Sequence, residues 1–285
     1  SSGLKSNLKA VQNDVEIIRG DIRNLKAVQR SMRGVDCVFH MAAIRAVARS
    51  VDNPQETHDV NVTGTFHVLL AARDRGVRRV VYSSSSAVYG DTKKFPSCED
   101  NRPCPISPYG LSKLMGEAYC QLFTRLYGLE TVSLRYFNVF GPRQNPESHY
   151  SMVIRIFIYR LVRGERPEIH WDGKQSRDFA YIDNIVLGNL LACSRKGISG
   201  EVFNISANEE LSILDILKTL ERILKKPVVR PWYGPKRPGD VHRTFANIRK
   251  AKHKLGFRIQ TRFQEGLEKT ARWFLDPQVF NRLHL

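Results

Sequence analysis

The sequence of 285 residues lacks the features that identify membrane, secreted and metal-binding proteins. No apolar run approaches the roughly 18 residues that a membrane-spanning helix needs, and the N-terminus does not resemble a signal peptide. The five cysteines form neither a Cys-x-x-Cys pair nor a zinc-ligand spacing, which favours free thiols in a reducing compartment and no bound metal. We therefore expect a cytoplasmic protein that does not insert into membranes.

Acidic residues are scarce relative to basic ones, 28 against 45, so the formal net charge is +17. Such a charge suits nucleic acid, an anionic membrane surface or small polyanionic ligands. The excess is dispersed, with some concentration over 225–262, and no basic stripe with interleaved aromatic residues occurs. We therefore expect a solvated cationic surface and no nucleic-acid partner.

Strand-like and helix-like segments alternate along the first half of the chain. Strands are expected at 15–18, 35–40, 79–83 and 130–136, and helices near 25–33, 54–75 and 111–127. This order predicts the α/β class, with a parallel sheet covered by helices on both faces. Ligands of such sheets bind at the carboxyl ends of the strands, where His40, 83–86 and 136–138 fall.

The pattern loosens after Pro142, which predicts a smaller C-terminal α/β lobe that closes over the strand ends. Its helices are expected near 152–162, 213–224, 248–255 and 263–274. We expect the sheet domain to comprise 1–140 with a strand and a helix near 179–206. The lobe would then comprise 141–178 and 207–285.

Tyr109 and Lys113 are the most informative pair of residues. They lie four apart at the start of the helix expected at 111–127, so their side chains project from one face. A nearby ammonium favours the phenolate form of tyrosine, whose ordinary pKa is about 10, so the pair suits a general base. The spacing alone is weak evidence, because Tyr89 and Lys93 repeat it across an expected turn. A half-buried ring beside a solvated lysine is the alternative.

Several longer motifs surround this pair in a fixed order. They are 20–22 (GDI), 39–43 (FHMAA), 61–65 (NVTGT), 83–90 (SSSSAVYG), 135–142 (RYFNVFGP), 176–179 (SRDF) and 237–240 (RPGD). Together they resemble the extended short-chain dehydrogenase/reductase family, and within it the UDP-glucose and UDP-N-acetylglucosamine 4-epimerases. The resemblance covers essentially the whole chain. It implies a Rossmann-like, doubly wound parallel sheet, an NAD cofactor, a UDP-sugar substrate and a homodimer.

The resemblance also implies a reaction and three catalytic residues. Hydride passes from C4 of the hexose to NAD while Tyr109 removes the 4-hydroxyl proton, directly or through Ser85. The resulting 4-keto sugar then receives the hydride on its other face. Lys113 would lower the pKa of Tyr109 and bond the nicotinamide ribose, and Ser85 would position the hydroxyl. The predicted function is NAD-dependent C4 epimerisation of UDP-GlcNAc/UDP-GalNAc, of UDP-Glc/UDP-Gal, or of both.

The binding residues that the resemblance implies fall into two sets. The cofactor set comprises Asp21, Ile22, Met41, Ala42, Ala43, Arg45, Asn61, Ser83, Tyr109, Lys113, Tyr136 and Phe137. The substrate set comprises Ser85, Tyr109, Asn138, Val153, Arg177, Arg237, Asp240 and Thr244. Arg177 and Arg237 would hold the UDP diphosphate, because guanidinium offers a planar fork of donors to phosphate. Surface charges are the alternative for both arginines.

Two positions bear on which relatives the chain resembles most. Ser86 and Ala87 stand where nucleotide-sugar 4,6-dehydratases carry an Asp-Glu pair, which argues against dehydration. Thr244 falls where a bulky residue restricts the sugar pocket to UDP-glucose in some relatives, so its small side chain predicts that UDP-GlcNAc is accepted.

A UDP-glucuronate epimerase or decarboxylase is an alternative to the 4-epimerase function. Another is a non-catalytic protein that binds nucleic acid or a protein partner through its basic surface.

The sequence departs from this family at its start. Neither Gly-x-x-Gly-x-x-Gly nor Gly-x-Gly-x-x-Gly occurs, although a glycine-rich turn before a helix normally receives the pyrophosphate of NAD. The segment 1–8 instead resembles the stretch after the second strand. The first strand, the glycine loop and the second strand are therefore expected to be missing, with the sequence continuing upstream of Ser1. A protein that has lost NAD binding is the alternative.

Overall fold

A four-stranded parallel sheet lies at the centre of the computed structural model, which describes residues 5–144, 153–225, 230–236, 241–276 and 279. Its strands, in spatial order, are β1 (Cys37–His40), β2 (Arg79–Ser85), β3 (Glu130–Tyr136) and β8 (Glu201–Ile205). Every neighbouring pair is parallel, so all four carboxyl ends meet at one edge. The predicted α/β class with a parallel sheet is confirmed.

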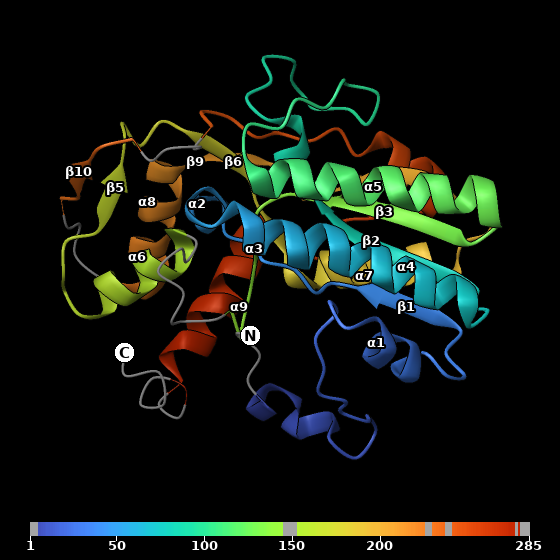
Figure 1. Ribbon diagram of the computed structural model, residues 1–285. Coiled ribbons are helices and arrows are strands. Elements are labelled where there is room, and N and C mark those ends of the chain that lie inside the picture. The colour runs from blue at the N-terminus through green and yellow to red at the C-terminus, as the bar shows by residue number, and fades with distance from the viewer. Residues whose placement is uncertain (1–4, 145–152, 226–229, 237–240, 277–278, 280–285) are drawn as a thin grey trace.

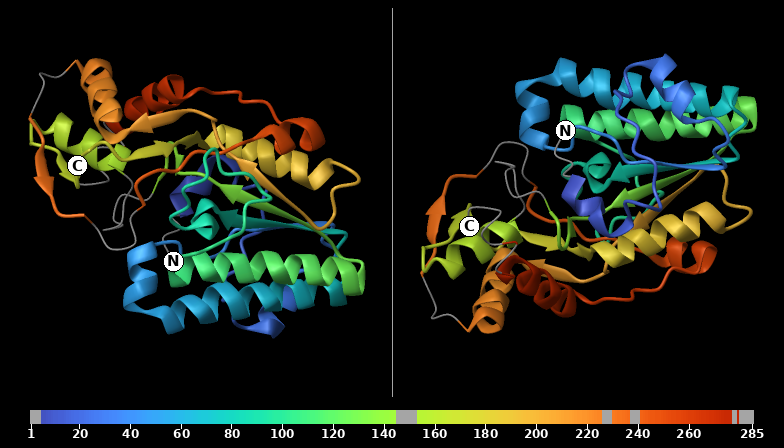
Figure 2. Two further views of the ribbon diagram at one scale, coloured as in Figure 1. Left: turned by 90° about the horizontal axis from the view of Figure 1, so that it is seen from above. Right: turned by 90° about the horizontal axis from the view of Figure 1, so that it is seen from below.

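Helices cover both faces of the sheet (Figure 1). Figure 2 shows α4 (Gly64–Asp74) and α5 (Pro108–Tyr127) along one face and α7 (Ile182–Ser194) along the other. The short helix α1 (Leu25–Ser31) packs against α4. Because β2 is covered on both sides, Val80, Val81 and Tyr82 are all buried, as expected for a central parallel strand.

Helix α5 carries Tyr109 and Lys113 and lies very close to β2. The Ser107 hydroxyl caps its first turn by accepting a hydrogen bond from the Gly110 N–H at 3.1 Å. Gly116 permits the close approach, because a Cβ there would lie 2.2 Å from the Tyr82 hydroxyl. The helix ends at Gly128, whose φ of 69° closes the last turn. The sequence predicted this helix at 111–127, so its start is three residues earlier than expected.

The strand expected at 15–18 is wrong. This segment pairs with no strand within the described part of the chain, and Val15, Ile17 and Ile18 are exposed. A strand exists only when a neighbour accepts and donates its hydrogen bonds, and no sequence pattern supplies that neighbour. Among the described residues β1 likewise pairs only with β2, on one side.

Other predicted elements differ in their bounds. The strand expected at 35–40 is shorter, β1, and the helix near 25–33 ends at Ser31. The expected helix at 54–75 is divided into α3 (Pro54–His58), a π-helical turn (Asp59–Thr63) and α4. The helix near 248–255 contains a π-helical turn at Ala251–Leu255. The sequence did not predict α2 (Val47–Asp52) or the 3-10 turn at Lys5–Val11.

A smaller lobe lies beside the sheet (Figure 2). The lobe has its own hydrophobic core. Its helices are α6 (Val153–Val162), α8 (Ile213–Leu224) and α9 (Phe263–Leu275). Its paired strands are β5 (Glu168–His170) with β10 (Trp232–Gly234), and β6 (Ser176–Asp178) with β9 (Glu210–Ser212). Short strands β4 (Val139–Phe140) and β7 (Ala180–Tyr181) pair where the lobe meets the sheet. The exact division of the chain into domains stays a prediction.

No helix in the described part of the chain is long and apolar enough to cross a membrane.

Candidate active site

A cavity of about 520 Å³ lies at the carboxyl ends of the strands, between the sheet and the smaller lobe. It collects residues from the end of β2, the start of α5, the loop after β1, the end of β3 and strand β6. The predicted site residues that line it are Met41, Ala43, Arg45, Ser83, Ser85, Tyr109, Lys113, Tyr136, Asn138, Arg177 and Thr244. The structure therefore brings together most of the residues that the motifs singled out from separate parts of the sequence.

Tyr109 and Ser85, two of the predicted catalytic residues, both line this cavity. Ser85 ends β2, and its hydroxyl accepts a hydrogen bond from the Ala87 N–H at 3.2 Å. Burial raises the pKa of the Tyr109 phenol above its ordinary value of 10.0, while a hydrogen bond with Ser85 and the charge of Arg45 act to lower it. Both side chains line the same cavity, and a proton relay from a sugar hydroxyl to Tyr109 through Ser85 stays a prediction.

Lys113 lies buried one turn further along α5. Its ammonium donates a hydrogen bond to the Ser83 carbonyl at 2.7 Å and lies 6.0 Å from the centre of the Tyr109 ring. Burial lowers the pKa of Lys113 to about 8. In this structure Ser85 and Arg45, rather than Lys113, favour the Tyr109 phenolate, so a lowering of the Tyr109 pKa by Lys113 stays a prediction.

A buried ion pair fastens α5 to strands β2 and β3. Glu117 accepts two hydrogen bonds from the Arg135 guanidinium, from Nε at 2.9 Å and from Nη2 at 2.7 Å, and a third from the Ser84 hydroxyl. Both charged side chains are only 4% exposed, so their charges are compensated by each other and by hydrogen bonds. Glu117 gives no signal in the sequence, since one acid on a helix is uninformative until its partner on β3 is known.

The loop after β1 is held in place by Asn61. The Asn61 amide accepts a hydrogen bond from the Ile44 N–H at 2.7 Å and donates to the Ile44 carbonyl at 2.9 Å and the Ser112 hydroxyl at 3.0 Å. Asn61 is itself buried and does not line the cavity. Its side chain therefore positions the segment that carries Met41, Ala43 and Arg45.

The wall on the lobe side is built from Arg177, Asn138 and Thr244. Arg177 is buried and donates to the backbone carbonyls of Val241 at 2.6 Å and His242 at 3.1 Å. The Asn138 amide donates to the Thr244 hydroxyl at 3.0 Å and also to the Asp178 carbonyl at 3.0 Å. These bonds place a guanidinium and a small hydroxyl side chain on one wall of the cavity.

The buried Asp178 carboxyl supports this wall through hydrogen bonds to neighbouring segments. It is fully buried, and its Oδ2 accepts hydrogen bonds from the Ser206 hydroxyl at 2.8 Å and the Ala246 N–H at 3.1 Å. Burial raises the pKa of the Asp178 carboxyl to about 7. This carboxyl is therefore close to half protonated near neutral pH in the folded protein, whereas an unfolded chain ionises it near pH 4.

We expect the Asp178→Asn variant to remove a pH dependence of stability. Because the folded-state pKa is raised, the native state binds one more proton than the unfolded chain between about pH 4 and pH 7. The free energy of unfolding therefore falls by up to about 4 kcal/mol as the pH rises through that window. Urea unfolding of both proteins at pH 5 and pH 8 measures this. The variant should gain stability relative to the wild type at pH 8 only. An equal difference at both pH values would contradict the raised pKa.

Several predicted site residues do not line the cavity. Phe137 is packed in the core against Tyr89, and Val153 packs among the apolar side chains of the smaller lobe. Asp21 forms an exposed ion pair with Arg23 at 2.6 Å, and Ile22 packs against Gly64. Ala42 is exposed and is not among the lining residues. The predicted Arg237 and Asp240 lie outside the described residues. The binding roles of all these residues stay predictions.

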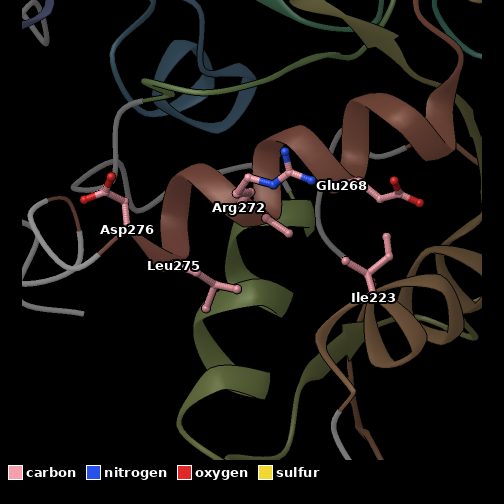
Figure 3. A pocket seen from close by; sticks show the side chains of 6 residues that line it. Ile223, Glu268, Arg272, Leu275 and Asp276 are labelled. Carbon is pink, nitrogen blue, oxygen red and sulfur yellow. The ribbon is translucent and has the colours of Figure 1, made fainter.

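A second hollow, of about 590 Å³, lies between α8 and α9 in the smaller lobe. Figure 3 shows Glu268 and Arg272 on α9, with Ile223 of α8 below them. Leu275 and Asp276 extend this hollow toward the end of α9. None of the predicted site residues that the structure describes lines this hollow, so the cavity around Tyr109 is the better candidate for an active site.

Comparison with known proteins decides the family. The model of the NAD dependent epimerase/dehydratase family matches residues 2–206. The chain belongs to this family. It is 35% identical over 278 residues to a putative UDP-glucose 4-epimerase of Methanocaldococcus jannaschii, covering 96% of this chain and 87% of that protein. The resemblance to the 4-epimerases that the sequence motifs indicated is confirmed.

Solved structures agree with this assignment. The UDP-N-acetylglucosamine 4-epimerase of Methanobrevibacter ruminantium, in complex with UDP-N-acetylmuramic acid, is 34% identical with a TM-score of 0.91, covering 96% of this chain and 88% of that chain. The UDP-glucose 4-epimerase of Thermus thermophilus, in complex with NAD, is 30% identical with a TM-score of 0.86, covering 94% and 88%. The Rossmann-like fold is therefore confirmed.

The residues of the cavity fit the nicotinamide end of NAD. Within the described part of the chain, the Ser83 carbonyl is the one hydrogen-bond acceptor of Lys113, so two of the three ammonium donors are available to ribose hydroxyls. Tyr109 and the exposed Arg45 line the same space. The sequence holds no glycine-rich turn for the pyrophosphate, so this fit concerns the nicotinamide half of the cofactor.

Proposed function

We propose that this protein catalyses the NAD-dependent epimerisation of a UDP-hexose at C4. The observation that carries the proposal is the convergence of Ser85, Tyr109 and the buried ammonium of Lys113 on one cavity at the strand ends, with that ammonium 6.0 Å from the centre of the Tyr109 ring. Family membership supplies the reaction class, and similar proteins of known structure include UDP-sugar 4-epimerases. The positions of the three side chains suit proton removal from a sugar hydroxyl.

The residues of this chain would divide the work as follows. Ser85 would hold the 4-hydroxyl of the sugar, and Tyr109 would accept its proton directly or through the Ser85 hydroxyl. The same phenol would return the proton once the 4-keto sugar has turned over in the cavity. When bound, NAD supplies the acceptor and donor of hydride for C4. Lys113 would bond the nicotinamide ribose with its remaining donors.

The charge of the cavity favours an anionic substrate. Its charged lining residues, within the part of the chain that the structure describes, are Arg45, Lys113 and Arg177, all of them cationic. Arg177 comes from strand β6, whereas Lys113 comes from helix α5, and Arg177 would hold the UDP diphosphate together with the predicted Arg237. A diphosphate bound there would leave the hexose between the lobe and Tyr109.

Turnover assays on the purified protein test the proposal. The protein would be incubated with UDP-GlcNAc, UDP-Glc and UDP-glucuronate, with and without added NAD, and the products resolved by chromatography and NMR. We expect C4 epimers of UDP-GlcNAc or UDP-Glc. Formation of a UDP-pentose from UDP-glucuronate would show a decarboxylase instead. Lack of any turnover by protein shown to bind NAD would contradict the proposal and favour a non-catalytic binding protein.

Thr244 gives a prediction about substrate choice. Replacing Thr244 with Tyr fills the wall beside Asn138, so kcat/KM for UDP-GlcNAc should fall by about 10²-fold while kcat/KM for UDP-Glc changes little. Thr244→Ser is the matched control, because it keeps the hydroxyl that accepts the Asn138 hydrogen bond. A wild-type protein that converts UDP-Glc but not UDP-GlcNAc would refute the steric argument.

The homodimer and the cytoplasmic location expected from the sequence belong to the same proposal. Leu122, Leu126 and Tyr127 of α5 are 37%, 63% and 50% exposed, which gives this helix an apolar outer face suited to a second copy. Light scattering on the purified protein tests the dimer, and a monomer at micromolar concentration would refute it.

A further inference from the structure

Two cysteines that are 156 residues apart in the sequence lie side by side in the fold. Cys37 is the first residue of β1, and Cys193 lies in the last turn of α7. Their sulfur atoms are 2.7 Å apart, with the Cys193 thiol donating to the Cys37 sulfur, and both are free thiols. A disulfide bond is about 2.05 Å long, so the two sulfurs need a shift of well under 1 Å to reach bonding distance.

The backbone around these two cysteines is held by a buried arginine. Arg79 lies directly beside Cys37 in the register of β1 and β2. Its Nη1 donates hydrogen bonds to the carbonyls of Cys193 and Ala192, both at 2.9 Å, and of Arg195 at 2.6 Å. These bonds fasten the last turn of α7 to the start of the strands. The closeness of the two sulfurs therefore follows from the packing of the sheet against α7, and not from a chance rotation of exposed side chains.

We propose that Cys37 and Cys193 are a dithiol that closes to an intramolecular disulfide when the folded protein meets a small-molecule disulfide such as oxidised glutathione. One protein thiolate attacks the small disulfide and releases one small thiol, and the second protein thiolate then attacks the mixed disulfide and releases the other. Two electrons pass from the protein to the oxidant. Two protein thiols and one small disulfide become one protein disulfide and two small thiols.

The disulfide would act on a strand that leads directly to the active site. β1 lies at the end of the described sheet, paired only with β2, and it continues into the loop of Met41, Ala43 and Arg45 that lines the cavity. A bond between Cys37 and Cys193 would tie the start of this strand to α7 and close a long loop of chain, which restricts the unfolded state. Oxidation is therefore expected to stabilise the fold without altering the catalytic side chains.

The other three cysteines provide internal controls. Cys120 lies on the buried face of α5, whereas Cys104 is exposed and Cys98 is partly exposed. Burial raises the pKa of the Cys37 thiol to about 12, so exchange is expected to be slow and should be followed to equilibrium. Selective loss of Cys37 and Cys193, with retention of the exposed Cys104, would show that geometry rather than accessibility directs the reaction.

Glutathione titration of the folded protein tests the proposal. The protein is equilibrated with oxidised and reduced glutathione at several ratios, alkylated under denaturing conditions and mapped by mass spectrometry. We expect a linked pair of peptides containing Cys37 and Cys193. Five alkylated thiols at the most oxidising ratio, a stable glutathione adduct on either cysteine, or a link to Cys98 or Cys104 would overturn the proposal.

A thermal measurement gives a second readout. Oxidised wild-type protein should melt roughly 5 °C or more above the reduced protein, since long closed loops give substantial stabilisation. Cys193→Ser should show no such difference between the two conditions, and Cys104→Ser should show the full difference. Equal melting temperatures for oxidised and reduced wild type, with the linked peptides present, would overturn the stabilising role.

Discussion

Replacing Tyr109 with Phe is expected to lower kcat for C4 epimerisation by about 10³-fold, since the variant loses the group that accepts the proton of the 4-hydroxyl. The ring remains, so the packing around it is kept, and binding of UDP should change little. Measurement of kcat by product chromatography, together with UDP affinity by calorimetry, separates the two effects. Unchanged turnover would show that Tyr109 is not the base.

Tyr89→Phe is the matched control for this variant. Tyr89 has the same spacing to Lys93 as Tyr109 has to Lys113, but its hydroxyl donates to the Asn204 side chain at 2.7 Å and does not line the cavity. We expect Tyr89→Phe to lower stability by about 1 kcal/mol through the lost buried hydrogen bond, with kcat close to that of the wild type. An equal loss of kcat in both variants would indicate a general effect of losing a buried hydroxyl.

Ser85→Ala separates positioning from proton acceptance. If Ser85 holds the 4-hydroxyl and relays its proton, its loss should reduce kcat by about 10²-fold, less than the loss of the base itself. The double variant Ser85→Ala with Tyr109→Phe should be no slower than Tyr109→Phe alone, because the two groups act as one unit. A multiplicative loss in the double variant would show independent roles.

The sequence predicted which residues gather at the strand ends, because their positions depend on helical periodicity and on motifs, while their catalytic roles stay predictions. Tyr109 and Lys113 lie one turn apart on one helix, so their common direction follows from helical periodicity. The alternation of strands and helices predicted that 83–86 and 136–138 meet at one edge, and the structure places Ser85 and Asn138 in one cavity. Local pattern and topology are sufficient for such predictions.

The remaining features depend on contacts between distant segments. The prediction of a strand at 15–18 was wrong because a strand requires a hydrogen-bonded neighbour, and the described part of the chain provides none for this segment. The close approach of the Cys37 and Cys193 sulfurs brings together a strand and a helix from opposite halves of the chain, and no spacing in the sequence predicts it. The pKa of Tyr109 likewise depends on how deeply α5 packs onto β2, which a motif does not report.

Removing the charge of Glu117 is expected to destabilise the fold by about 3–5 kcal/mol, because it leaves the Arg135 guanidinium buried without its counter-ion. Glu117→Gln keeps the size of the side chain, so the loss reports the charge and the hydrogen bonds rather than a cavity. Urea unfolding with linear extrapolation gives the free energy of unfolding of each protein. A change below about 1 kcal/mol would show that the pair contributes little.

Two further variants show whether the loss of stability comes from the buried ion pair or from the change in net charge. Glu265→Gln removes an exposed carboxylate that lies 2.7 Å from Lys269 on α9, and the unfolding midpoint should not move. The double variant Glu117→Leu with Arg135→Met replaces both buried charges by apolar side chains of similar length. It should be more stable than Glu117→Gln, because neither charge is then left unpaired.

Glu117→Gln also tests whether the ion pair of Glu117 and Arg135 supports turnover. Glu117 lies one turn beyond Lys113 on α5 and accepts a hydrogen bond from Ser84, the neighbour of Ser85 on β2. Glu117 therefore holds α5, which carries the predicted base Tyr109, against β2, which carries Ser85. Even where Glu117→Gln remains folded, kcat should fall while KM changes little, since small displacements of Tyr109 from Ser85 weaken proton transfer more than substrate binding. A folded variant with wild-type kcat would show that the ion pair serves stability alone.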